Sequence, residues 1–100
     1  MNLALSEIKI YTVKFCLYCL RAKDLLTSKG VSFEEIDVSH DNEKRVKMAE
    51  LAGSYSVPQI FVDDRYIGDC DGVFMLDSEG VLDLKLKGLE WGFEQIRLKL

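Results

Sequence analysis

Two cysteines separated by two residues, Cys16 and Cys19, limit most strongly what this chain can fold into. The residues before them, Ile8–Val13, are β-branched and aromatic and predict a strand. The residues after them, Leu20–Lys29, predict a helix that ends at Gly30. A Cys-X-X-Cys pair that opens a helix directly after a strand is typical of a redox-active dithiol.

The start of a helix gives the two thiols different roles. The thiolate is the reactive form of cysteine, and the unpaired N–H groups of a first helical turn favour an anion. Cys16 falls at this start, and Lys14 adds a positive charge two residues earlier. Cys19 falls one turn deeper. We therefore expect Cys16 to be the attacking thiol and Cys19 the resolving thiol.

A structural zinc site is one alternative for such a pair. Zinc usually takes four ligands as two closely spaced pairs. By count alone, Cys16, Cys19, Cys70 and His40 make a permitted set, but the chain has no second pair. Two inert buried cysteines are the other alternative. The position at a strand-to-helix junction favours the redox pair over both, so we expect no resident metal on the cysteines unless a cluster binds.

Length and charge bound the class of protein. One hundred residues predict a single domain, residues 1–100. A net charge of −4 argues against nucleic acid and anionic membranes as partners. The chain shows neither a signal-peptide pattern nor an apolar run of membrane-spanning length, so we expect it in the cytoplasm, or inside an organelle after loss of a presequence. A Cys-X-X-Cys pair there is expected to cycle between its redox states.

Hydrophobic periodicity and turn residues predict the order β-α-β-α-β-β-α. The strands are expected at Ile8–Val13, Ser32–Val38, Gln59–Val62 and Arg65–Ile67, and the helices at Leu17–Lys29, Glu43–Ala52 and around Phe74–Leu76. This order predicts an α/β fold with a four-stranded mixed sheet and helices on both faces.

The same patterns predict which side chains face inward and which residue caps the third helix. The inward residues are expected to be Leu17, Leu20, Asp24, Leu25 and Leu26 on the first helix, and Val46, Ala49 and Leu51 on the second. Asp71 is expected to cap the third helix.

The tail beyond Asp83 predicts a C-terminal helical extension over about residues 84–100. Leu82, Leu86, Leu89, Phe93, Ile96 and Leu100 recur at helical spacing and share one face. Leu84, Trp91 and Leu98 fall nearly opposite, so we expect this second line to contact another protein or a second copy of the chain. The alternation of Leu82, Leu84 and Leu86 leaves a strand as the alternative.

Four stretches over about residues 7–83 resemble the glutaredoxin family, which has the thioredoxin fold. They are Cys16–Cys19, where the family commonly has C-P-Y-C; Ser28–Asp37, similar to its second strand; Ser56–Phe61, similar to T-V-P-x-x-F; and Gly68–Asp71, similar to G-G-x-D. The resemblance implies a thioredoxin-like fold and reduction of protein disulfides and glutathione mixed disulfides. Glutathione would be the co-substrate, recycled by the glutathione reductase system.

The resemblance also implies a glutathione site. Val57–Pro58 would be cis and would offer the Val57 backbone edge to the extended tripeptide. The ring of Tyr18 would cover one side of the ligand, and Asp71 would hold its amino group. The full set of implied glutathione contacts is Lys14, Tyr18, Val57, Pro58, Cys70 and Asp71. Cys70 can equally be inert, form a side disulfide or accept glutathione.

The sequence departs from the family pattern within this site. Val13 stands where the family often has a lysine, and Ser54 and Tyr55 stand where it often has a basic or glutamine side chain. Asp69 replaces the second glycine of G-G-x-D and adds a negative charge.

Leu17 replaces the usual proline, and family members without that proline more often hold a [2Fe-2S] cluster. They bind it as dimers through the nucleophilic cysteine, here Cys16, and glutathione. An iron–sulfur carrier and a redoxin reduced by a thioredoxin reductase are therefore the alternative functions.

Overall fold

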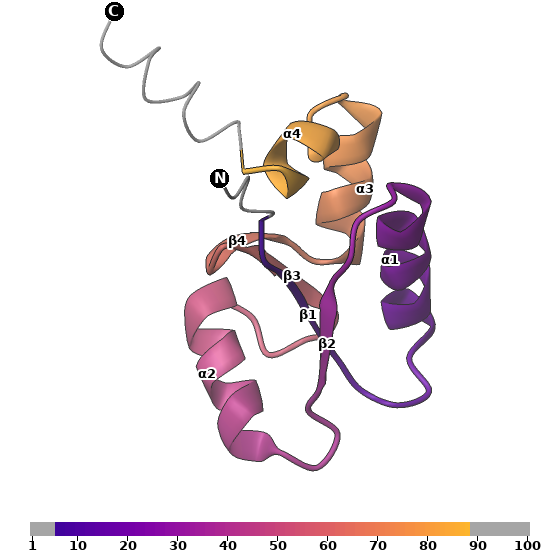
Figure 1. Ribbon diagram of the computed structural model, residues 1–100. Coiled ribbons are helices and arrows are strands. Elements are labelled where there is room, and N and C mark those ends of the chain that lie inside the picture. The colour runs from indigo at the N-terminus through magenta and orange to yellow at the C-terminus, as the bar shows by residue number, and fades with distance from the viewer. Residues whose placement is uncertain (1–5, 89–100) are drawn as a thin grey trace, which may run out of the picture.

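A computed structural model describes residues 6–88 of the chain (Figure 1). Its elements are β1 (Ile8–Thr12), α1 (Leu17–Ser28), β2 (Glu34–Asp37), α2 (Asn42–Ala52), β3 (Gln59–Val62), β4 (Arg65–Gly68), α3 (Cys70–Ser78) and α4 (Leu82–Leu86). This confirms the predicted order and the α/β fold. The strands Ile8–Val13 and Ser32–Val38 were predicted a little too long.

The sheet has the strand order β2-β1-β3-β4 and is mixed. The strand β1 runs parallel to β2 and antiparallel to β3, and β3 pairs antiparallel with β4. Asp63 and Asp64 form the turn between β3 and β4, both with positive φ, a conformation that suits a tight hairpin. The helices α1, α3 and α4 cover one face of the sheet and α2 covers the other (Figure 1).

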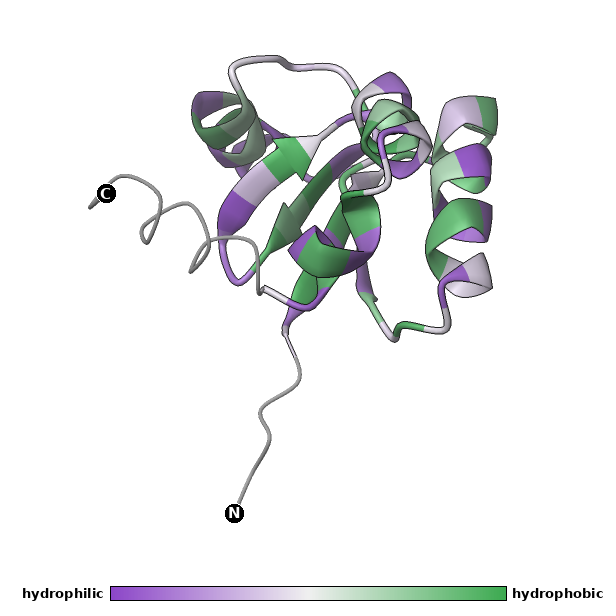
Figure 2. Cartoon of the chain, turned by 90° about the horizontal axis from the view of Figure 1, so that it is seen from above, coloured by the Kyte–Doolittle hydropathy of each residue, from purple (hydrophilic) through white to green (hydrophobic). Residues whose placement is uncertain are grey.

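The main hydrophobic core lies between the sheet and α1, α3 and α4. Side chains alternate along β1, so that Ile8, Ile10 and Thr12 are buried while the residues between them are partly exposed. The core residues are Ile8, Ile10, Ala22, Leu25, Leu26, Ile60, Val62, Cys70, Val73, Leu82 and Leu86. In Figure 2 the hydrophobic colour is concentrated on the central strands and on parts of the helices beside them.

The inward face predicted for α1 was partly wrong. Leu17 and Leu20 are 75% and 50% exposed, and Asp24 is also exposed. The buried residues are Cys19, Ala22, Leu25 and Leu26. They recur every three or four positions and share one side of the helix, which puts Leu17 and Leu20 on the opposite side.

The prediction for α2 was wrong in the same way. Val46 and Leu51 are 41% and 66% exposed, whereas Met48 is fully buried and Ala49 is half-buried. Arg45, Met48, Ala49 and Ala52 are the more buried positions, and they follow the i, i+3, i+4, i+7 spacing of one helical face. Met48 is therefore the one buried side chain of α2, and its neighbours on the same face are only partly buried.

The residue that caps α3 differs from the prediction. Asp69, and not Asp71, precedes the helix, and its side chain accepts a hydrogen bond from the Gly72 N–H at 2.8 Å. The helix begins at Cys70, two residues earlier than a cap at Asp71 allows, so Asp71 lies in the first turn.

The residues Leu82–Leu86 are helical, as predicted, and do not form the alternative strand. This helix ends at Leu86, with Lys87 as its C-cap and Gly88 at a φ of 72°, so the helix predicted over about residues 84–100 does not run unbroken through residue 88. Leu82 and Leu86 are buried in the main core, so this core reaches past the boundary predicted near Asp83. The remaining residues of both apolar lines, including Trp91 and Leu98, lie outside the described residues, and self-association through this tail stays a prediction. Among residues 6–88, no helix has the length and hydropathy needed to cross a membrane.

We predict that Met48→Ala lowers the free energy of unfolding by about 2–4 kcal/mol, because it empties a fully buried site under α2. Leu51→Ala is the matched control on the same helix and should cost less than about 1 kcal/mol, since Leu51 is exposed. Chemical denaturation followed by circular dichroism measures both values. Equal losses would contradict the orientation of α2.

Candidate active site

The Cys-X-X-Cys pair lies at the junction of β1 and α1. The connecting loop turns at Phe15, which has a φ of 58° and a fully exposed side chain. Cys16 is the N-cap residue of α1, and its sulfur accepts the Cys19 backbone N–H at 3.1 Å. This bond satisfies one of the unpaired donors of the first turn. Cys16 is partly exposed, and Cys16, Cys19 and Cys70 are all free.

Cys19 differs from Cys16 in being buried beneath the loop. Burial raises the pKa of the Cys19 thiol to about 12, helped by the hydrogen bond that this thiol shares with Cys16 and only partly opposed by a hydrogen bond with Val13. Cys19 therefore stays a thiol at neutral pH. Cys16 is partly exposed and Cys19 is buried, and this difference supports Cys16 as the nucleophile and Cys19 as the resolving thiol.

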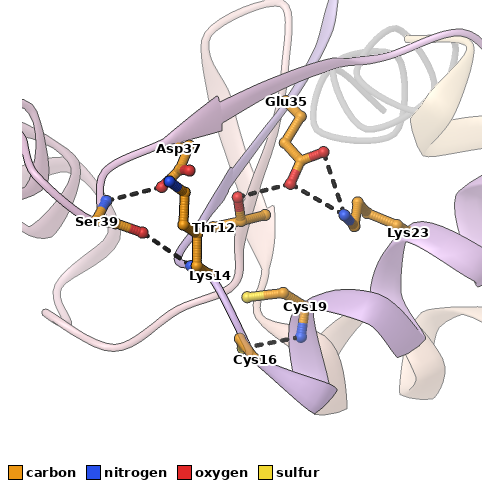
Figure 3. A network of polar contacts seen from close by, with 8 residues as sticks. All are labelled: Thr12, Lys14, Cys16, Cys19, Lys23, Glu35, Asp37 and Ser39. Carbon is orange, nitrogen blue, oxygen red and sulfur yellow. Dashed lines mark hydrogen bonds and ion pairs between the residues drawn. The ribbon is translucent and has the colours of Figure 1, made fainter.

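A hollow of about 650 Å³ adjoins the two sulfurs, and we call it the Cys16 hollow. It is lined by Thr12, Val13, Lys14, Phe15, Cys16, Leu17, Cys19, Leu20, Lys23, Glu35 and Asp37. Along one wall, Ser39 donates its N–H to Asp37 at 2.8 Å and its Oγ accepts the Lys14 backbone N–H at 2.8 Å (Figure 3). Hydrogen bonds from Ser39, and to a smaller degree the charge of Lys14, lower the pKa of Asp37.

A second polar group on the same hollow joins β1, α1 and β2. The buried Thr12 hydroxyl donates to Glu35 Oε2 at 2.8 Å, and Lys23 Nζ lies 3.0 Å from the same oxygen (Figure 3). These bonds satisfy a buried hydroxyl beside Cys19. None of these three residues was predicted from the sequence to belong to the site. Helical spacing could have indicated Lys23, because it follows Cys19 by four residues and so lies on the same side of the helix.

A smaller hollow of about 140 Å³ shares no lining residue with the Cys16 hollow, and we call it the Pro58 hollow. It is lined by Tyr18, Ser56, Val57, Pro58, Asp69, Cys70 and Asp71. The Val57–Pro58 bond is cis, as expected. Five of the six residues expected to contact glutathione meet here, whereas Lys14 lines the Cys16 hollow.

Cys70 and His40 lie in different surroundings, one buried and the other exposed. Cys70 is buried, and burial, followed by the charge of Asp71, raises the pKa of its thiol. His40 is exposed in the turn before α2. Within the part of the chain that the structure describes, no three His, Cys, Asp or Glu side chains lie close enough to hold a metal ion. The set Cys16, Cys19, Cys70 and His40 is therefore not brought together.

Comparison with known proteins finds one family repeatedly. The glutaredoxin family model matches residues 8–67. Glutaredoxin 3 of Escherichia coli strain K12 is 47% identical over 83 residues, which cover 83% of this chain and all of that protein. The solution structure of a glutaredoxin from Brucella melitensis has a TM-score of 0.75 and 44% identity over 83% of this chain and 90% of its own. A structure described as metal binding of glutaredoxins has a TM-score of 0.65 and 43% identity, over 83% of this chain and 90% of its own.

We predict that a thiol alkylating reagent at neutral pH modifies Cys16 first and leaves Cys19 and Cys70 largely intact, because burial raises the pKa of both latter thiols. Cys19 should become reactive only as the pH rises toward about 12, where its thiol ionises in the folded protein. Mass spectrometry of alkylated peptides across a pH series reports each site. The same reaction in denaturant should modify all three cysteines, and equal rates in the folded protein would contradict the assignment.

Proposed function

Because the chain belongs to the glutaredoxin family, we propose that this thiol–disulfide oxidoreductase uses glutathione to reduce protein disulfides and glutathione mixed disulfides. We assign Cys16 as the nucleophile and Cys19 as the resolving thiol. The observation that carries this assignment is the bond from the Cys19 N–H to the Cys16 sulfur at 3.1 Å, which marks Cys16 as the sulfur at the helix start. The proposal places the cycle in the cytoplasm, where glutathione is kept reduced.

The proposed cycle begins with attack of the Cys16 thiolate on one sulfur of the substrate disulfide. A bond forms between Cys16 and that sulfur, and the other sulfur leaves with the electron pair and takes a proton from water. Cys19 then loses its proton to solvent and attacks Cys16, which breaks the bond between Cys16 and the retained sulfur; that sulfur leaves with the electron pair and is protonated by water. When the retained group is glutathione, a second glutathione thiolate can instead attack its sulfur, which releases the Cys16 thiolate and forms glutathione disulfide. The Cys19 route leaves a Cys16–Cys19 disulfide, which two glutathione molecules reduce while they are oxidised to their own disulfide.

The Pro58 hollow is the proposed position of glutathione. Val57 offers backbone groups to an extended tripeptide, Tyr18 offers a half-exposed ring, and Asp71 offers a carboxylate to an amino group. Cys70 is a buried thiol in the lining of this hollow. We therefore assign it a part in the shape of the hollow and no part in the thiol exchange. Lys14, on the Cys16 hollow, is in place to meet a carboxylate of the substrate that approaches from that side.

We predict that Cys16→Ser abolishes turnover of a glutathione mixed disulfide, whereas Cys19→Ser keeps it, because glutathione itself can resolve the intermediate. Consumption of NADPH in an assay with glutathione and glutathione reductase measures both variants. Reduction of a protein disulfide should fall strongly in both, since it depends on the second thiol. A Cys16→Ser variant with near-normal activity would reject the proposal.

The same assay separates glutathione from other electron donors. Replacing glutathione and its reductase with a thioredoxin reductase should leave the wild-type protein slow. Fast turnover with thioredoxin reductase, together with no turnover with glutathione, would instead identify a redoxin served by that enzyme.

A [2Fe-2S] carrier is the second candidate function. Cys16 is partly exposed, and the exposed apolar side chains of Phe15 and Leu17 flank it, which leaves this face open to a second copy. Metal binding is also described for a glutaredoxin 43% identical to this chain. Since residues 6–88 offer no group of three ligands, the other ligands would come from glutathione and a second Cys16.

We predict that protein purified without oxygen in the presence of glutathione is colourless in the visible range and monomeric if it acts only as an oxidoreductase. Visible absorption with sedimentation checks this. A coloured dimer that is lost in Cys16→Ser would support the carrier function.

A further inference from the structure

The Pro58 hollow is lined by two aspartates, and among residues 6–88 no Lys, Arg or His lines it. Asp69 and Asp71 both line it, and its other residues, Tyr18, Ser56, Val57, Pro58 and Cys70, are uncharged at neutral pH. Both carboxylates contribute to raising the pKa of the Cys70 thiol, behind burial as the main cause. Arg21 on α1 acts on Cys70 in the opposite sense but does not line the hollow.

Contacts at the start of α3 hold the Asp69 carboxylate in place. Its Oδ1 accepts the Gly72 N–H at 2.8 Å. A Cβ on Gly72 would lie 3.2 Å from that oxygen, and a Cβ on Gly68 would lie 3.3 Å from the Gly72 Cα. Two glycines therefore let the chain close tightly around the carboxylate. Asp69 supplies the anion that a helix N-terminus attracts, at the place where an anionic ligand would otherwise bind.

We infer that Asp69 makes the Pro58 hollow selective for a positively charged group on the half of the disulfide that becomes bonded to Cys16. The inference rests on the proposed function, because it names the preferred substrate class of the same site. Glutathione carries two carboxylates and one ammonium group, so it meets repulsion from Asp69. A thiol that bears an ammonium group without a carboxylate meets attraction from both Asp69 and Asp71.

The chemical step is the disulfide exchange already described. The Cys16 thiolate forms a bond to one sulfur of R–S–S–R, the S–S bond breaks, and R–S⁻ leaves with the electron pair and is protonated by water. The retained R group then occupies the hollow. The charge of R therefore acts on the rate of this step.

The test compares three symmetric disulfides that differ in charge. They are formed from 2-aminoethanethiol (cationic), 2-mercaptoethanol (neutral) and 3-mercaptopropionate (anionic). The reduced full-length protein is mixed with each at low ionic strength, and mass spectrometry follows the rate at which Cys16 is modified. The same rates with a small free thiol in place of the protein correct for the intrinsic reactivity of each disulfide.

Asp69→Asn removes the charge but keeps an oxygen that can accept the Gly72 N–H. Asp41→Asn is the matched control. Asp41 caps α2 in the same way, since its Oδ1 accepts the Lys44 backbone N–H at 3.1 Å, and this substitution changes the net charge equally. Thermal unfolding checks that both variants are folded.

We expect the wild type to favour the cationic disulfide over the anionic one, and Asp69→Asn to reduce this ratio roughly three- to tenfold, the effect of one unit charge in a largely solvated hollow. Asp69→Asn should also lower the KM for glutathione, while Asp41→Asn changes neither value. An unchanged ratio in Asp69→Asn, an equal change in Asp41→Asn, or a wild-type preference for the anionic disulfide would overturn the inference.

The two proposals fail in different experiments. A wild type that turns over with glutathione but shows no charge preference refutes only the role of Asp69. A wild type that shows the charge preference but no turnover with glutathione refutes only the proposed co-substrate, since the single exchange with each disulfide needs no glutathione.

Discussion

The active site depends on one hydrogen bond, in which the sulfur of Cys16 accepts the Cys19 N–H and so caps α1. A helix usually takes an oxygen from Ser, Thr, Asp or Asn at this position. A sulfur in its place puts a partly exposed thiol at the first turn of the helix. Because the same turn buries Cys19, one helix start leaves Cys16, the proposed nucleophile, accessible and keeps Cys19, the proposed resolving thiol, protonated.

The two hollows are built by different parts of the chain. The Cys16 hollow joins β1, α1 and β2 through the bonds of Glu35 with Thr12 and Lys23. The Pro58 hollow joins the start of α1, the cis proline loop and the start of α3. Lys14 and Asp69 lie on different hollows. In the proposed cycle, the two halves of a disulfide substrate would therefore meet surfaces of different charge.

The errors in the sequence analysis share one cause. Leu17 and Leu20 are apolar and were expected inside, yet both are exposed near Cys16. Asp71 and Asp69 are both good capping residues, and a shift of two residues in the helix start decides between them. Residue type predicted that a helix forms and that an aspartate caps it. The direction of each side chain depends on how the helix rotates against the sheet, which a local pattern does not fix.

The sequence by itself determined the order of elements, the strand Gln59–Val62 and the placement of Cys16 and Cys19 at a helix start, because these depend on neighbours along the chain. It also indicated the residues now gathered at the Pro58 hollow, through a family resemblance. Tertiary structure alone decided that Lys14 lines the Cys16 hollow with Glu35 and Asp37, that Thr12 donates a hydrogen bond to Glu35, and that Asp69 lines one hollow with Tyr18 and Pro58. The reason is physical: these contacts join residues far apart in sequence, and sheet register and helix rotation bring them together.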